Sequence, residues 1–474
     1  MDQIAPTPED DEALVDRLIA RARAAQAKFE AGATQARYDR AAQAAGWAIM
    51  EPARNEEMAK LAVETTGLGN VADKIRKNHR KTLGLLRDIA DARTCGVISD
   101  DAATGITEIA RPIGVVGAVV PSTNPIATPA NNVINALKCG NAIILSPSPK
   151  GAAGCERLLG YIHAEFDKIG VERDLVQMIP APVNKVKAQR LLEKADLVVV
   201  TGSQDNVRRA YSSGTPAVGV GAGNVTVIVD ETADLEAAAA KIVASKTFDN
   251  ATSCSSENAV VVVDAVYDAF VAALKAEGAA ILGQEMEAHV TERLWPRGHL
   301  ARAALAQDAD KLVAALELED HVPADAKIVA VETDGLGPDH KLSGEKLSLV
   351  VALRRARDFA HAKEIATRLF AHLGAGHSVG VHTALDERAM ELGRDTPTCR
   401  VIVNQAHCFA NGGSFDNGLP FSLSMGCGSW GGNSIDENLH WRHFMNTTRV
   451  VRPIAPREPG VDEIFADYWA EAGK

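Results

Sequence analysis

The 474-residue chain lacks the long apolar runs, the basic excess and the paired cysteines that are typical of membrane, nucleic-acid-binding and zinc-binding proteins. Without a run of about 18 apolar residues, we expect no membrane-spanning helix. The formal net charge of −12 argues against a nucleic-acid partner or an anionic membrane surface, because both require a basic binding surface. The start of the chain is acidic and has no apolar segment behind a basic one, so we expect no secretory signal and a cytoplasmic location.

The seven cysteines include no CxxC pair with the spacing of a zinc site, and cytoplasmic chains rarely keep disulfides. Each cysteine is therefore interpreted as a small buried hydrophobe or a reactive thiol. His440 and His443 are spaced like metal ligands on a helix. No carboxylate or cysteine with ligand spacing is recognised beside them, so we expect a surface or subunit contact there and no metal.

Apolar segments alternate with helical ones from near residue 113 onward. The predicted strands are residues 113–120, 141–146, 196–201, 259–263, 327–332, 348–353, 377–383 and 399–404. The predicted helices are residues 10–31, 126–140, 151–170, 203–214 and 234–248. Apolar runs without alternation, separated by helices, indicate parallel sheets covered on both faces. The fold class is therefore α/β, with two α/β domains in succession and a boundary near residue 235.

A GxGxxG turn that opens a helix is missing, so the usual dinucleotide fingerprint does not apply. Helix N-termini bind phosphates without that motif, and residues 202–207 predict such a terminus after a strand. Cys254 lies among small polar residues, between a predicted helix and a buried strand. Such neighbours surround a thiol with backbone N–H groups, which a nucleophile attacking a carbonyl needs for the developing oxyanion. A lone cysteine is more often structural, so its position alone leaves both interpretations open.

Several segments together resemble the coenzyme A-acylating branch of the aldehyde dehydrogenase superfamily. These segments are residues 111–150, 211–224, 248–262, 343–353 and 423–438. The resemblance implies two Rossmann-like α/β domains plus a small β oligomerisation extension, assembled as a homodimer or homotetramer. The implied domains are 1–103 with 114–235 for the nicotinamide cofactor, 236–437 for catalysis, and 104–113 with 438–474 for oligomerisation.

The resemblance also implies roles for particular residues. Cys254 would attack the aldehyde as a thiolate and keep the acyl group as a thioester after hydride transfer. Asn124 matches the asparagine that stabilises the oxyanion, and Glu345 matches the residue that holds the nicotinamide ribose. The alternatives are a turn residue before Pro125 for Asn124 and a solvated loop carboxylate for Glu345. Further cofactor-binding residues are expected at Ser122, Thr123, Ser146, Ser148, Lys150, Gly202, Ser203, Val207, Gly219, Val220 and Gly221.

The sequence departs from the hydrolytic members of the superfamily at Gly219. Those enzymes have a glutamate in a Glu-Leu-Gly-Gly stretch that activates water, whereas residues 219–222 here are Gly-Val-Gly-Ala. General-base help is worth about 10²–10⁴-fold, and a thiol acceptor needs less of it because a few per cent is thiolate at neutral pH. The departure favours transfer of the acyl group to coenzyme A.

Cofactor and substrate follow from two further stretches. No carboxylate after the strand at 141–146 would repel a 2′-phosphate, and Ser148 and Lys150 could contact one, which favours NADP over NAD. Residues 407–450 resemble the subgroup that acts on sulfoacetaldehyde, whose sulfonate needs a basic or donor-rich pocket. The substrate candidates are His407, Asn411 and Ser422. The alternatives are another short aldehyde (acetaldehyde, propionaldehyde or succinate semialdehyde), a hydrolytic aldehyde dehydrogenase, an acyl phosphate reductase, or a non-catalytic nucleotide-binding protein.

Overall fold

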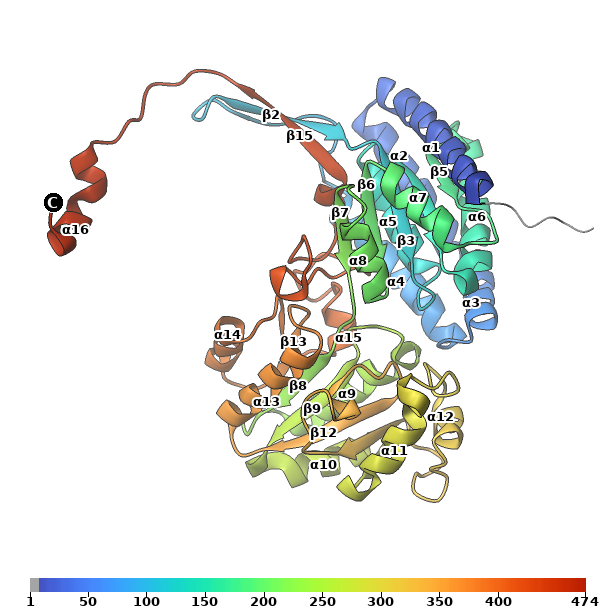
Figure 1. Ribbon diagram of the computed structural model, residues 1–474, viewed down its shortest axis with the longest axis vertical. Helices are drawn as coiled ribbons and strands as arrows, with labels where there is room; N and C mark the ends of the chain where they lie inside the picture. Colours follow the sequence, from blue (N-terminus) through green and yellow to red (C-terminus); the bar gives the residue numbers. More distant parts are fainter. Residues whose placement is uncertain (1–7) are drawn as a thin grey trace, which may run out of the picture.

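The computed structural model describes residues 8–474, so the acidic start of the chain lies partly outside the described residues. Figure 1 shows two α/β bodies, one above the other, and an arm that extends from the first body toward the C-terminus. The first body holds a five-stranded sheet and the second body a seven-stranded sheet. This architecture confirms the predicted α/β class.

The first body is built on a parallel sheet in the order β5-β4-β3-β6-β7. Its strands are β3 (Val115–Val120), β4 (Ala142–Pro147), β5 (Val176–Met178), β6 (Leu197–Thr201) and β7 (Ala217–Val220). The strand order reverses between β3 and β6. In open parallel sheets, ligands bind beyond the carboxyl ends of the strands at such a point.

Helices cover both faces of this sheet (Figure 1). They are α1 (Pro8–Ala31), α2 (Gln35–Met50), α3 (Pro52–Thr66), α4 (Val71–Ile89), α5 (Ala127–Lys138), α6 (Ala152–Ile169), α7 (Lys185–Lys194) and α8 (Gln204–Tyr211). Gly140 follows α5 with a φ of 75°, a conformation that favours glycine. Ser203 caps α8, because its hydroxyl accepts the backbone N–H of Asn206.

The second body is built on a parallel sheet in the order β10-β11-β12-β9-β8-β13-β14. Its strands are β8 (Val225–Val229), β9 (Glu257–Val263), β10 (Ala279–Leu282), β11 (Ile328–Glu332), β12 (Val350–Ala356), β13 (Val379–His382) and β14 (Val401–Val403). Its helices are α9 (Leu235–Thr247), α10 (Tyr267–Ala276), α11 (Glu287–Leu294), α12 (Ala309–Ala315), α13 (Phe359–His372), α14 (Asp386–Asp395) and α15 (His407–Ala410). Because β8 belongs to this sheet, the chain changes sheets between Val220 and Val225, earlier than the expected boundary near 235.

The third sheet is antiparallel and forms the base of the arm. It consists of β1 (Gly96–Asp101), β2 (Ile106–Pro112) and β15 (Met445–Val451), and β15 pairs with β2 along its whole length. The extension was expected to begin at residue 104, but β1 also lies in it. Beyond β15 the chain runs exposed to helix α16 (Val461–Ala472), which stands apart from both bodies (Figure 1).

The predicted strands and helices are present, with ends that differ by a few residues. Strands β5, β7 and β10, with 3, 4 and 4 residues, were not predicted. Helices α2–α4 were also missed, although they form much of one face of the first body. Across residues 8–474, none of the helices combines the length and the apolar character needed to span a lipid bilayer.

Candidate active site

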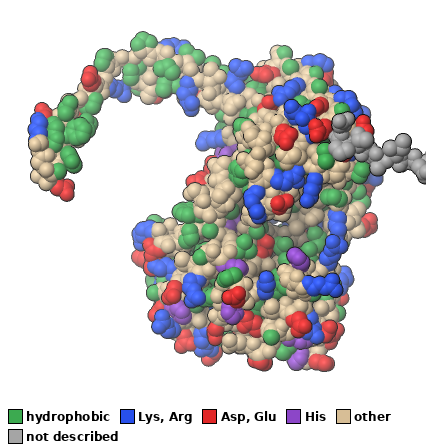
Figure 2. Space-filling view, viewed as in Figure 1, with side chains coloured by type: hydrophobic (Ala, Val, Ile, Leu, Met, Phe, Trp, Pro, Cys, Tyr) green, Lys and Arg blue, Asp and Glu red, His purple; other side chains and the backbone are tan. Residues whose placement is uncertain are grey.

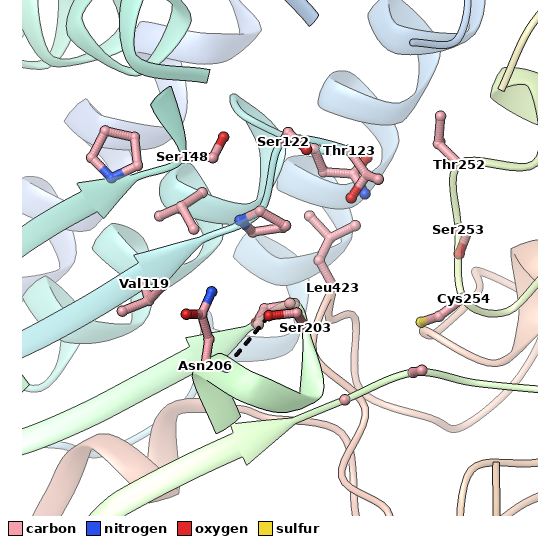
Figure 3. A pocket seen from close by; sticks show the side chains of 18 of the residues that line it. Val119, Ser122, Thr123, Ser148, Ser203, Asn206, Thr252, Ser253, Cys254 and Leu423 are labelled. Carbon is pink, nitrogen blue, oxygen red and sulfur yellow. Dashed lines mark hydrogen bonds between the residues drawn. The ribbon is translucent and has the colours of Figure 1, made fainter. Parts of the chain in front are cut away.

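A cavity of about 690 Å³ lies beyond the carboxyl ends of β3, β4 and β6, where the second body faces the first. The first body contributes the turns that follow these strands, and the second body contributes the loop that carries Cys254 (Figure 3). The loop from Gly412 to Met425 lines the cavity as well. The site therefore depends on residues that are far apart in sequence.

Cys254 is half-buried, and its sulfur points from the loop into the cavity (Figure 3). The loop begins after α9 with left-handed φ angles at Asp249 (49°), Asn250 (53°) and Ala251 (59°), none of which is a glycine. Such residues cost about 1–3 kcal/mol each and persist only where the surroundings hold them. The backbone that presents Cys254 is therefore strained and needs support.

The carboxylate of Asp249 supplies much of that support. It is fully buried and accepts hydrogen bonds from Lys74 Nζ at 3.1 Å, Lys77 Nζ at 2.5 Å and Thr252 Oγ1 at 2.8 Å. Its other oxygen accepts the backbone N–H of Asn70 at 3.0 Å. Two lysines of α4 thus fix the Cys254 loop against the first body, and the charged neighbours keep the pKa of Asp249 below its usual value despite burial.

Lys77 also connects this loop to Asn124. Its Nζ donates to Asn124 Oδ1 at 2.9 Å and to Thr252 Oγ1 at 2.9 Å, besides its ion pair with Asp249. An ammonium has three donors, so all three are in use. Because Oδ1 of Asn124 faces a cation, the amide nitrogen is the end left free to donate. Asn124 lines the cavity together with Cys254, as an oxyanion donor would.

The charge state of the site is set mainly by burial. Burial raises the pKa of the Cys254 thiol to about 12, and the nearby Glu345 carboxylate raises it further. Burial also raises the pKa of Glu345 to about 7. Glu345 lines the cavity and is the one carboxylate among the described residues that do so. A second thiol, Cys408, also lines the cavity.

The predicted cofactor residues fall into two groups. Those that line the cavity are Ser122, Thr123, Ser146, Ser148, Gly202, Ser203, Gly221 and Glu345. Those that do not are Lys150, Val207, Gly219 and Val220. Lys150 is exposed, Val207 is buried beneath α8, and Gly219 is held by hydrogen bonds with the Tyr211 hydroxyl. These four residues lie outside the wall of this cavity, and their contact with a cofactor stays a prediction.

Four cations of the cavity wall were missed, Lys77 and Lys81 on α4 together with Lys185 and Arg209. Lys185 begins α7 and Arg209 lies on α8, and both line the cavity. Arg209 donates to the Lys185 carbonyl at 3.0 Å and to Gln189 Oε1 at 3.1 Å. Nothing in the local sequence marks them, because they become neighbours only when α7 and α8 pack beside β6.

The substrate candidates also divide. Ser422 lines the cavity, whereas His407 and Asn411 do not. His407 is buried and its Nε2 lies 2.8 Å from Ser378 Oγ, and burial lowers its pKa to about 3, which leaves it neutral. Asn411 donates to Ser255 Oγ at 2.9 Å, directly behind Cys254. Asn411 thus supports the loop that carries Cys254, and contact of either residue with the substrate stays a prediction.

His440 and His443 have a carboxylate neighbour that the sequence interpretation overlooked. Their Nε2 atoms lie 3.2 and 3.3 Å from the Glu437 carboxylate. Within residues 8–474, these three residues are the one group of histidine, cysteine and carboxylate side chains close enough together to hold a metal ion. However, His440 Nδ1 accepts the Arg442 backbone N–H, and His443 Nδ1 accepts that of His440. Nε2 of each ring is then the atom placed to donate to Glu437, so hydrogen bonding accounts for the cluster.

Comparison with known proteins agrees with this geometry. The model of a family described as "Aldehyde dehydrogenase family" matches residues 1–292. The chain is 57% identical to a sulfoacetaldehyde dehydrogenase (acylating) of Cupriavidus necator, over 97% of this chain and 93% of that protein. It is 40% identical to the protein of that name from Bilophila wadsworthia, over 93% and 96%. The crystal structure of an acetylating aldehyde dehydrogenase from Geobacillus thermoglucosidasius superposes with a TM-score of 0.91 at 31% identity, covering 96% of this chain and 100% of that one.

Proposed function

The chain belongs to the aldehyde dehydrogenase family, and on this premise we propose that it converts sulfoacetaldehyde and coenzyme A into sulfoacetyl-CoA with reduction of NADP or NAD. The observation that carries the proposal is the Cys254 sulfur, which points into a cavity shared by two α/β bodies. Relatives that are named for acylating activity on this aldehyde support the choice of substrate.

The described residues fit a nicotinamide cofactor in this cavity. The cavity covers the carboxyl ends of β3 and β6 at the reversal of strand order, where dinucleotides bind in such sheets. Ser203 begins α8, whose first-turn N–H groups favour a phosphate. A side chain at Gly202 would meet no atom within 4 Å, so the space above this turn is open. When bound, the cofactor accepts a hydride from the substrate carbon.

In the proposed mechanism, the Cys254 thiolate attacks the aldehyde carbon and forms a thiohemiacetal. The Asn124 amide and the Cys254 backbone N–H stabilise the negative oxygen. Loss of hydride from the carbon leaves a thioester on Sγ. The acyl group then passes to the coenzyme A thiolate, and Cys254 leaves as a thiolate ready for another cycle.

The residues across the cavity favour a thiol as acyl acceptor. Gly221 and Ala222 line it from the stretch in which hydrolytic relatives carry their water-activating glutamate. Neither offers a base, so water attacks the thioester slowly. Glu345 is the one carboxylate of the wall, and we assign it to the nicotinamide ribose.

We favour NADP over NAD because the part of the cavity wall formed by the first body carries basic side chains. Lys185 and Arg209 line the cavity, and no carboxylate follows β4 to repel a 2′-phosphate. We also propose a cytoplasmic location, because a reducing compartment keeps a nucleophilic cysteine from oxidation.

We propose that the chain forms a homo-oligomer, a dimer or tetramer, through its arm. Figure 2 shows hydrophobic side chains gathered on α16 at the end of the arm. Val461, Ile464, Phe465 and Tyr468 are 64%, 60%, 43% and 63% exposed. Burying these exposed apolar side chains of α16 against another surface would lower the free energy of the protein. A second copy of the chain carries the same apolar surface and can pack against it.

The proposed function is tested by assaying a panel of aldehydes with coenzyme A and each nicotinamide cofactor. We expect thioester formation from sulfoacetaldehyde, faster with NADP, and its loss in Cys254→Ala. Cys155→Ala is the matched control, because this thiol is buried in the first body away from the cavity. Acid formation without coenzyme A at a comparable rate would identify a hydrolytic enzyme, and phosphate-dependent turnover would identify an acyl phosphate reductase. Activity that survives in Cys254→Ala would refute the mechanism.

A further inference from the structure

Helix α4 presents three lysines to the interface between the two bodies. Lys74, Lys77 and Lys81 are spaced three and four residues apart, and their exposed fractions are 4%, 4% and 8%. Asp249 pairs with Lys74 at 3.1 Å and with Lys77 at 2.5 Å. Lys81 takes part in none of the ion pairs formed within residues 8–474. One buried cation of the three therefore lacks a counter-charge.

The Lys81 ammonium has spare hydrogen-bonding capacity. Its acceptor among the described residues is the Gly412 carbonyl at 2.5 Å, which uses one of three N–H donors. A Cβ on Gly412 would lie 2.6 Å from Nζ, so the ammonium is packed tightly against this glycine. Burial lowers the pKa of Lys81 to about 7, and the neighbouring Arg80 lowers it further. A buried charge without a partner is costly unless a ligand supplies the opposite charge.

Lys81 lines the same cavity as Cys254, and so do Gly412, Ser422 and Met425 around it. It is close enough to the nucleophile for a thiolate at Cys254 to raise its pKa. Lys77 also lines the cavity, but Asp249, Asn124 and Thr252 occupy its three donors. Of the two lysines of α4 in the cavity wall, Lys81 is therefore the one with donors left for a negative group on the substrate.

We propose that the Lys81 ammonium binds the sulfonate of the aldehyde and thereby selects an anionic substrate at the Cys254 site. This inference rests on the proposed function and adds the residue responsible for specificity. A sulfonate is a permanent anion with three acceptor oxygens, so it satisfies both the charge and the free N–H groups of Lys81. The ion pair forms on binding and no covalent bond changes.

The rival role for Lys81 is stabilisation of the Cys254 thiolate for any aldehyde. The two roles differ in their dependence on substrate charge. Loss of a sulfonate binder lowers turnover of sulfoacetaldehyde far more than turnover of uncharged propionaldehyde. A thiolate stabiliser affects both aldehydes equally and also slows alkylation of Cys254 by iodoacetamide.

The test compares the full-length parent with Lys81→Met and Lys81→Gln, and uses Lys60→Met as control because Lys60 is exposed on α3. For both Lys81 variants we expect kcat/KM for sulfoacetaldehyde to fall about 10- to 100-fold, the value of a hydrogen bond to a charged group. Because Lys81 and a Cys254 thiolate stabilise each other, we expect kcat/KM for propionaldehyde and the iodoacetamide rate to fall as well, but by much less than kcat/KM for sulfoacetaldehyde. Ethanesulfonate should protect Cys254 from iodoacetamide in the parent and not in the variants.

Equal losses for both aldehydes, or unchanged protection by ethanesulfonate in the variants, would overturn the role of Lys81. These results leave the proposed function intact as long as the parent itself prefers sulfoacetaldehyde. A parent that acylates coenzyme A from propionaldehyde but not from sulfoacetaldehyde would instead refute the proposed substrate, and the sulfonate subsite with it. Unfolding temperatures of all variants show whether each one is folded.

Discussion

Replacing Lys77 by methionine separates the positioning of Asn124 from the chemistry of Cys254. The substitution removes donors to Asn124 Oδ1 at 2.9 Å, Asp249 Oδ2 at 2.5 Å and Thr252 Oγ1 at 2.9 Å. Methionine keeps most of the apolar stem, so no large cavity results. Asp249 keeps its ion pair with Lys74, so its carboxylate is weakened but not left alone.

Two magnitudes follow for Lys77→Met. Removing one partner of a buried ion pair costs about 3–5 kcal/mol, and we expect the lower end because Lys74 remains. The bond from Lys77 to Asn124 is charge-assisted, worth about 1.5–3 kcal/mol. Without it the amide is free to rotate by half a turn and present oxygen instead of nitrogen to the oxyanion. We therefore expect kcat to fall about 10- to 100-fold, less than the 10²–10³-fold loss from removing an oxyanion donor altogether.

The assay is steady-state turnover of sulfoacetaldehyde, with stability followed by urea unfolding. Lys77→Arg is the matched variant, because it keeps a donor for Asn124 and should recover part of kcat. In the double variant with Asn124→Ala, loss of Lys77 should cost little more, since the amide that it orients is gone. A kcat within about threefold of the parent in Lys77→Met, alongside the expected loss of stability, would refute the positioning argument.

Other predictions concern charge, packing and assembly. Because Glu345 raises the pKa of Cys254 and itself titrates near pH 7, Glu345→Gln should speed iodoacetamide alkylation of ligand-free Cys254 above pH 7, by about tenfold per pKa unit; equal rates in the variant and the parent above pH 7 would contradict this. Gly412→Ala should destabilise the protein by about 1–3 kcal/mol in urea unfolding, since its methyl would lie 2.6 Å from Lys81 Nζ; an unchanged midpoint would show that Lys81 moves freely. Truncation after residue 451 should lower the number of subunits, as derived from the molar mass in light scattering. An unchanged number of subunits would refute the role given to α16.

The local sequence determined which segments become strands and helices, and it singled out Cys254, which we propose as the nucleophile. Apolar runs such as 115–120 have too few polar side chains for a solvent-facing strand, so they required a sheet covered on both faces. Capping and turn residues also act locally. Ser203 caps the start of α8 and Gly140 follows the end of α5, as their residue types predict. Cys254 and Asn124 were identified because they lie in short segments whose pattern resembles a family.

Only the tertiary structure decided how charges are distributed around the nucleophile. Lys77 and Lys81 lie on a helix that the sequence interpretation missed, and their partners Asp249 and Gly412 are far away along the chain. His407 was predicted as a substrate ligand, and packing buries it outside the cavity wall. The physical reason is that a side chain's charge, exposure and partners depend on elements brought together by folding. Local propensity and patterning carry no information about those contacts.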